Sequence, residues 1–192
     1  MNLKPADLIA KYYAHSADAH RLLLAHSQQV TRKALTIARR LTAGGTNIDL
    51  EFVAQAAMLH DIGMIFTNAP DLYCFGDLPY LAHGIKGHEI LCFEGYPKHA
   101  RVCERHTGIG LTATEIIVQK LPLPARDMLP ETLEEQIICY ADLFFSKNPS
   151  DRDREKTPAE VRSALVHYGE EKGLIFERWQ QRFEPQSAQR KA

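Results

Sequence analysis

Apolar side chains recur at offsets of three and four residues along most of this chain, the spacing of one face of an α-helix. The longest such stripe predicts a helix over about residues 18–43, which the pair Gly44-Gly45 ends. A shorter stripe predicts a helix over about residues 49–61. No convincing period-two alternation, the mark of a half-buried strand, is found. The pattern therefore predicts an all-α fold, a bundle of helices.

Caps and breakers place the other elements. Three Thr-x-x-Glu capping boxes begin at Thr112, Thr132 and Thr157, and each marks a helix start. The Pro- and Gly-rich stretch 67–79 is too broken for regular structure, and such loops often lie over functional sites. Further helices are expected over residues 5–13, 82–93, 97–106 and 133–146, followed by two C-terminal helices.

The length of 192 residues fits one domain, residues 1–192, which would bury roughly 70% of the surface of its unfolded chain. We expect the core over about 20–147, with the charged run 148–156 separating it from C-terminal helices at about 157–183. An apolar stripe on the last of these, including Phe176, Trp179 and Phe183, would dock it on the core. A frayed tail is expected at 184–192.

Charge and composition exclude several classes of protein. The net charge is −1, so no electrostatic argument supports binding to polymeric nucleic acid or to acidic membranes. The N-terminus lacks an apolar signal core and no run is long enough to cross a membrane, so a cytoplasmic location is expected. The four cysteines form no Cys-x-x-Cys pair, which argues against a structural zinc site. The nine histidines, in contrast, are more than packing requires.

His60 and Asp61 stand side by side at the end of the second long helix. His60 continues the inward apolar face of that helix, and Gly63 is expected to let the chain leave in a left-handed conformation. Imidazole beside carboxylate suits a borderline divalent metal, and a buried carboxylate without a cation is costly. For the pair alone, a helix end whose His and Asp cap backbone groups is the favoured interpretation, and only the other metal-binding side chains along the sequence change it.

Other metal-binding side chains occur at fitting places. His26 lies in the middle of the apolar face of the first long helix, where a core histidine bonded to a carbonyl is the simpler alternative. Asp142 lies on an inward apolar stripe and needs a partner there. His83 begins one helix and His106 ends another, so both would reach the rim of a bundle core. Six nitrogen and oxygen donors without a thiolate are enough for two metals that share one carboxylate.

The order of these residues resembles the HD-domain superfamily, and more closely its small single-domain HDIG metal-dependent phosphohydrolases. The resemblance covers roughly residues 21–147, and stretches such as 82–91 and 129–135 are similar to one HDIG subgroup over long runs. It rests on the following residues in chain order: His26, His60-Asp61, His83-Gly84, His106-Thr107-Gly108 and Tyr140-Ala141-Asp142.

The resemblance implies a helical bundle with its metal site between core helices. It implies that His26, His60, Asp61 and Asp142 bind a first divalent metal, and that Asp61 bridges to a second, completed by His83 and His106. The metals would be Fe or Mn, with Mg, Ni, Co or Zn as alternatives. A metal-activated water held by Asp61 would hydrolyse a phosphoester of a small phosphorylated substrate, a nucleotide being expected.

Two features of this sequence differ from those of relatives that act on cyclic dinucleotides. Relatives that act on cyclic dinucleotides often carry Lys where this chain has Met64. The tripeptide Gly95-Tyr96-Pro97 matches one found in cyclic-di-GMP phosphodiesterases, but it lies before His106, in the wrong order, and we interpret it as coincidence. A symmetrical dinucleoside-tetraphosphate hydrolase subgroup is nearer, although its match is partial.

Four further residues are weaker candidates. His88 lies about 140° around the helix from His83, so it is a proton donor to the substrate or a surface residue. Lys86 is one turn from His83 and would contact a phosphate or only solvent. Ser146 and Lys147 follow Asp142 by about one turn and are candidate phosphate contacts.

Two other functions fit the same donors. Myo-inositol oxygenase and related diiron oxygenases, which act on a small polyol or a phosphonate-like substrate, use the same fold and ligand order. A non-catalytic nucleotide-sensing module with an inert metal site is the second alternative, which the intact ligand set disfavours. The sequence leaves the oligomeric state open, a homodimer included.

Overall fold

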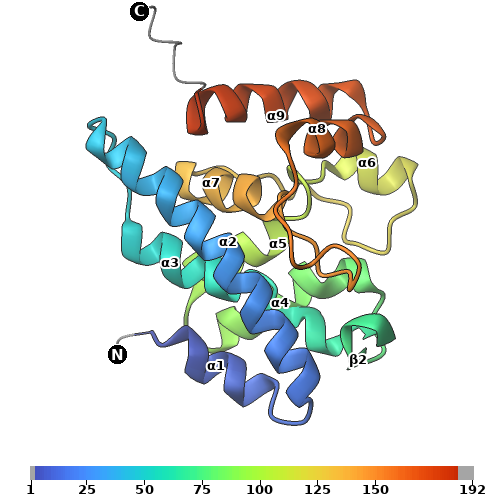
Figure 1. Ribbon diagram of the computed structural model, residues 1–192. Coiled ribbons are helices and arrows are strands. Elements are labelled where there is room, and N and C mark those ends of the chain that lie inside the picture. The colour runs from blue at the N-terminus through green and yellow to red at the C-terminus, as the bar shows by residue number, and fades with distance from the viewer. Residues whose placement is uncertain (1–2, 186–192) are drawn as a thin grey trace, which may run out of the picture.

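Helix α2, Ala17–Ala43, is the longest element of the fold and runs diagonally across the molecule (Figure 1). It begins at Ser16, whose side chain accepts a hydrogen bond from the Ala19 backbone N–H, and it ends at Gly44. Its buried face packs on α3, Leu50–Leu59, and on α7, Leu133–Asp142. The computed structural model describes residues 3–185.

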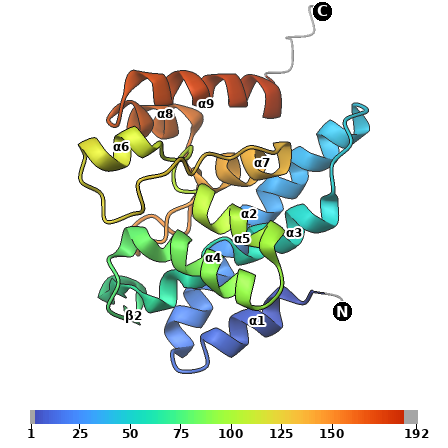
Figure 2. The same cartoon turned by 180° about the vertical axis from the view of Figure 1, so that it is seen from behind.

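The remaining helices complete the bundle around this axis. Seen from behind, α4 and α5 lie side by side, with α6 and its following loop projecting to one side (Figure 2). Within residues 3–185, every helix is too short or too polar to cross a bilayer. The further helices are α1 (Pro5–Tyr12), α4 (His83–Phe93), α5 (Pro97–Arg105), α6 (Ala113–Val118), α8 (Pro158–Val166) and α9 (Glu170–Phe183). The predicted all-α fold is confirmed.

The predicted loop 67–79 contains more regular structure than its composition indicates. Strands β1, Asn68–Ala69, and β2, Cys74–Phe75, form a minimal antiparallel hairpin. A 3-10 turn, Pro70–Leu72, joins them, and Tyr73 follows with a left-handed φ of 58°. The expectation of no strand was therefore wrong here, because two-residue strands are too short to show a period of two.

Two helix ends also differ from expectation. Helix α7 ends at Asp142 rather than at residue 146, and the chain then turns so that Phe144 packs on Phe176 at 6.0 Å between ring centroids. Gly63 does not adopt a left-handed conformation. A Cβ atom there would lie 2.2 Å from the His83 carbonyl oxygen, so this glycine instead lets the chain after Asp61 approach α4.

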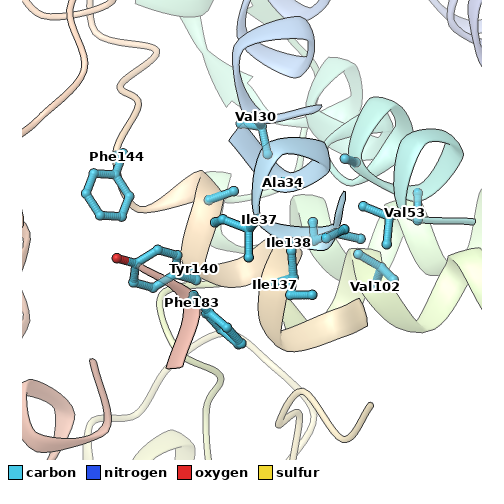
Figure 3. Close-up of a cluster of buried hydrophobic side chains, with 14 of the residues drawn as sticks. Val30, Ala34, Ile37, Val53, Val102, Ile137, Ile138, Tyr140, Phe144 and Phe183 are labelled. Carbon is cyan, nitrogen blue, oxygen red and sulfur yellow. The ribbon is translucent and has the colours of Figure 1, made fainter. Parts of the chain in front are cut away.

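Buried apolar side chains form two clusters on either side of the middle of α2. One joins the later part of α2 to α3, α5, α7 and α9, and Figure 3 shows Ile137 and Ile138 of α7 facing Val53 and Val102. The other joins the earlier part of α2 to α1, α4 and α5. His26 lies between the two clusters, so the seam between them passes through the candidate site.

The last helix, α9, packs on α7. Phe176 and Phe183 are fully buried, and Tyr140 stacks on Phe176 at 5.4 Å. The Tyr140 hydroxyl donates to the Glu184 carboxylate at 2.7 Å. Of the tail expected at 184–192, residues 186–192 lie outside the part of the chain that the structure describes.

Candidate metal centre

Six side chains that the sequence singles out converge at the seam between the two apolar clusters. They come from the middle of α2, the end of α3, the start of α4, the residue after α5 and the end of α7. Their ligand atoms form two groups within which all atoms lie within 4.8 Å of one another. The first group is His26, His60, Asp61 and Asp142, and the second is Asp61, His83 and His106.

In the first group, two imidazole nitrogens lie close to one oxygen of each of two carboxylates. The Nε2 atoms of His26 and His60 lie 3.2 and 3.0 Å from Asp61 Oδ2. The same nitrogens lie 3.0 and 3.4 Å from Asp142 Oδ1. Four donors from α2, α7 and the end of α3 therefore face one point.

The second group uses the other oxygen of Asp61. His83 Nε2 and His106 Nε2 lie 3.2 and 3.4 Å from Asp61 Oδ1. Asp61 is fully buried and offers one oxygen to each group. The two groups sharing Asp61 are consistent with a dinuclear metal site.

Backbone carbonyls fix the orientation of three of the imidazoles. The Nδ1 atoms of His60, His83 and His106 each lie 2.7 Å from the carbonyl oxygen three residues earlier, which belongs to Ala57, Tyr80 and Cys103 respectively. A carbonyl only accepts, so each Nδ1 carries the hydrogen and each Nε2 is left with a lone pair for a metal. Such second partners are typical of metal-binding histidines.

The Nε2 lone pairs face one another, which favours a cation between them. His83 Nε2 and His106 Nε2 are 3.1 Å apart, and His26 Nε2 and His60 Nε2 are 3.3 Å apart. Within residues 3–185, Asp61 Oδ1 and Asp142 Oδ1 are buried without a hydrogen-bond donor of good geometry. Lone pairs and carboxylates buried together are costly unless a cation binds them. The donor set therefore fits divalent metals of the kind that bind nitrogen and oxygen ligands.

Charge coupling shifts the pKa values of the site residues strongly. Burial alone would raise the pKa of Asp61 and Asp142, but Lys147 and His60 hold both well below their usual value. Burial alone would lower the pKa of His60, but the two carboxylates raise it to about 10. Burial lowers the pKa of His106, the effect of Asp61 being smaller. The carboxylates thus stay ionised, as metal ligands must.

Lys147 is the one weaker candidate that reaches the His/Asp groups within residues 3–185. Its Nζ lies 2.7 Å from Asp61 Oδ2, and the side chain is 13% exposed. The same ammonium interacts with the phenol of Tyr80. Burial would lower the pKa of Lys147, but Asp61 reverses this and raises it. Lys147 therefore stays protonated, and it lines the cleft next to the site.

The other weaker candidates lie at different distances from the centre. Ser146 lines the same two surface clefts as Lys147. Lys86 pairs with Glu89 at 2.9 Å and lies over the ring of Phe66. His88 faces Glu104 at 4.0 Å and Cys92. In residues 3–185, no hydrogen bond or ion pair joins Lys86 or His88 to the His/Asp groups.

Three residues near the centre have no sequence signal that would have identified them. Tyr80 stacks on the His83 imidazole at 4.8 Å between centroids and supplies its carbonyl acceptor. Arg105 pairs with Glu135 at 3.2 Å and so ties the end of α5, next to His106, to the start of α7. Arg152 lines the cleft that His26 and Lys147 also line. Each contact depends on how separate elements meet, which helical periodicity does not encode.

The similarity to known proteins covers the same part of the chain. A sequence model of the HD domain matches residues 23–145. A tRNA (cytidine(56)-2'-O)-methyltransferase of Picrophilus torridus is 38% identical over 132 residues, which are 68% of this chain and 33% of that protein. A protein of the same description from Thermoplasma volcanium is 32% identical over 141 residues, 73% of this chain and 35% of that protein.

A third relative is an uncharacterized protein of Methanocaldococcus jannaschii, 37% identical over 118 residues, 61% of this chain and 62% of that protein. The chain thus spans about a third of the length of the two methyltransferases and about three fifths of the third relative. No solved structure matches the chain significantly. Because the family match covers more than half of the chain and takes in all six gathered side chains, this protein belongs to the HD domain family.

Proposed function

We propose that this protein is a metal-dependent phosphohydrolase that cleaves a phosphoester of a small phosphorylated substrate, with a nucleotide as the expected class. The observation that carries the proposal is the pair of His/Asp groups that share the fully buried Asp61. Membership of the HD domain family supports it. The methyltransferase activity in the names of two relatives is not part of it, because this chain spans only a third of those proteins.

Each of the six side chains has a role in this proposal. His26, His60 and Asp142 would hold one divalent ion, His83 and His106 the other, and Asp61 both. When bound, such ions lower the pKa of water towards ~7 and neutralise charge on phosphoryl oxygens. The carbonyl acceptors behind His60, His83 and His106 keep the Nε2 atoms aimed inward, which reduces the rearrangement that binding requires.

Lys147 would contact the phosphoryl group directly. Its ammonium now pairs with Asp61 Oδ2, an atom that belongs to the first metal group. A divalent ion on that oxygen repels an ammonium, so Lys147 must turn outward when metal binds. It then faces the cleft that it lines with Ser146, where a phosphoryl oxygen is its natural partner.

The test is phosphate release by protein loaded with Mn or Fe, using a panel of nucleotides and simple phosphomonoesters. Asp61→Asn keeps the shape of the side chain but removes its charge, and we expect it to abolish turnover. His167→Ala, an exposed histidine far along the chain in α8's C-cap, is the matched control and should leave the rate unchanged. Oxygen uptake without phosphate release would replace the proposal by the oxygenase alternative, and absence of both would favour the sensing module.

A further inference from the structure

The metal centre opens into a cleft of about 390 Å³, a size typical of small-ligand sites. The cleft lies between the earlier part of α2 and the segment that follows α7. His26 and Lys147 form its inner end, since both contact Asp61. The rest of the lining includes two arginines, Arg21 and Arg152, and two carboxylates, Asp18 and Asp153, together with Gln29 and Tyr73.

Arg152 stands out among the cations of this cleft. Arg21 pairs with Asp18, and Lys147 pairs with Asp61. Within residues 3–185, the guanidinium of Arg152 has no carboxylate within ion-pair distance, although its side chain is only partly exposed. A half-buried, unpaired guanidinium has lost part of its hydration without gaining a partner, which favours binding of an anion.

The backbone next to this guanidinium is held in place. The side-chain amide of Gln29, on α2, donates to the Arg152 carbonyl at 3.1 Å. This bond fastens the charged run 148–156 to the same helix that carries His26. The run therefore does more than separate the core from the C-terminal helices, because it presents a cation to the cleft at a fixed place relative to the metal centre.

One aromatic side chain, that of Tyr73, lines the cleft. Tyr73 lies after the 3-10 turn of the β1–β2 hairpin, with a left-handed φ of 58°, which is unusual for a bulky side chain. The Ser16 hydroxyl donates to its carbonyl at 3.3 Å. Tyr73 is 39% exposed, and its ring can stack on a flat ring of a ligand. Unusual backbone conformations of this kind occur preferentially at ligand sites.

We infer that this cleft binds a second phosphate of the substrate, with Arg152 as its main contact, so that the substrate is a nucleotide bearing two phosphates rather than one. The inference rests on the proposed function, because it places the scissile phosphate at the metal centre beside Lys147. The planar guanidinium suits bidentate binding to a phosphate, and the ring of Tyr73 provides a surface for the base.

The test compares ADP with AMP, as probes with two phosphates and one, each in the form of a methylene analogue that resists cleavage, by equilibrium dialysis against Mn-loaded protein. The parent protein should bind ADP more tightly than AMP. Arg152→Met should weaken ADP binding roughly 10- to 100-fold, the range for losing a charged hydrogen bond, and leave AMP binding within about twofold. The matched control is Arg154→Met, in the same segment, because Arg154 pairs with Asp151 and Glu160 and does not line the cleft.

Two outcomes would overturn the inference. Equal affinities of the parent protein for ADP and AMP would show that no second phosphate is recognised. Equal weakening of both probes by Arg152→Met would place this arginine on the scissile phosphate instead. Hydrolysis of p-nitrophenyl phosphate, measured on the same proteins, separates the two proposals. If the protein hydrolyses this compound but shows no preference for ADP, only the binding site for a second phosphate is refuted. If it prefers ADP but shows no hydrolysis, only the proposed function is refuted.

Discussion

Asp61→Asn should remove the stabilisation that metal ions give this protein, and the structure sets the size of the effect. Asp61 offers one carboxylate oxygen to each group of donors. The substitution leaves the first group with three ligand residues and the second with two histidines. The two-histidine group should no longer bind an ion, and the three-residue group should bind at least ~100-fold more weakly, since even changes behind the ligands cost 10–100-fold.

The magnitude follows from mass action. An ion present at 100 times its dissociation constant stabilises the folded protein by about 2.7 kcal/mol, so two independent ions contribute about 5 kcal/mol. For a chain of this length, each kcal/mol raises the Tm by about 2–4 °C. The parent protein should therefore gain roughly 10–20 °C in Tm on loading with metal. Asp61→Asn should gain less than half of this.

His83→Ala provides the intermediate case. It removes a donor from the second group only, so one ion should remain and about half of the Tm gain with it. His167→Ala is the control that removes an exposed histidine outside both groups. Each comparison uses the difference in Tm between chelator-treated and metal-loaded samples of the same variant, which cancels the effect of the substitution on the metal-free protein.

The assay is differential scanning fluorimetry combined with metal analysis by mass spectrometry. We expect about two ions per chain in the parent protein, one in His83→Ala and fewer than one in Asp61→Asn. The reasoning would be refuted if Asp61→Asn kept two ions and the full rise in Tm. One ion in the fully loaded parent protein would refute the assignment of the second group while leaving the first intact.

Three further predictions concern charge and packing. First, Asp61 and Asp142 raise the pKa of His60 from 6.5 to about 10, against the effect of burial. The contribution of His60 to stability is therefore complete below pH 6.5 and is lost as pH rises through about 10. Urea denaturation of chelator-treated protein should show this loss, and metal-loaded protein, with neutral imidazoles, should not. Second, Lys147→Met should destabilise metal-free protein by about 3–5 kcal/mol, because it leaves Asp61 buried without its ammonium partner. Chelator competition should nevertheless show tighter metal binding by this variant, and weaker binding would contradict the expected outward turn of Lys147. Third, Phe176→Ala should cost about 3–5 kcal/mol in the free energy of unfolding, whereas Phe93→Ala, at an 83% exposed side chain, should change it by no more than about 0.5 kcal/mol.

Helices could be predicted from this sequence because their signals are local. In all three predicted capping boxes, at Thr112, Thr132 and Thr157, both reciprocal hydrogen bonds are present. The start and end of α2 lie within one residue of the expected bounds, since Ser16 caps one end and glycine follows the other. Such caps act over three or four residues and do not depend on the rest of the fold.

The end of α7 could not be predicted in this way. Phe144 and Phe145 continue an apolar spacing that also fits a helix. The structure ends the helix at Asp142, buries Phe144 against α9 and returns Lys147 to Asp61. Packing of Phe144 against Phe176, on a helix far along the chain, outweighs the local periodicity, so the position of Lys147 follows from tertiary contacts.

The sequence was enough to predict the His and Asp side chains of the candidate site, but not the residues around them. The donors lie on inward faces or at ends of helices, and each is a side chain whose burial without a partner is costly. Tyr73, Tyr80 and Arg152 instead lie in a hairpin, a 3-10 turn and a charged connection. Nothing in their spacing indicates that Tyr73 and Arg152 line one cleft or that Tyr80 stacks on His83, because these positions depend on tertiary contacts such as the hydrogen bond between Gln29 and Arg152.

The place of the site in the fold connects metal binding to the stability of the whole bundle. The six donors join α2, α4, α5 and α7 with the end of α3, and they lie between two apolar clusters that each hold only part of these elements. The two buried carboxylates at that seam are costly to keep ionised so close together, and bound cations would offset that cost. Helices α2 and α5 contribute to both clusters, and bound ions would add a further link between the clusters at this seam. A metal-free protein should lose order first along this seam, at His26 and Asp61, before either apolar cluster opens, and hydrogen exchange would detect this sequence of events.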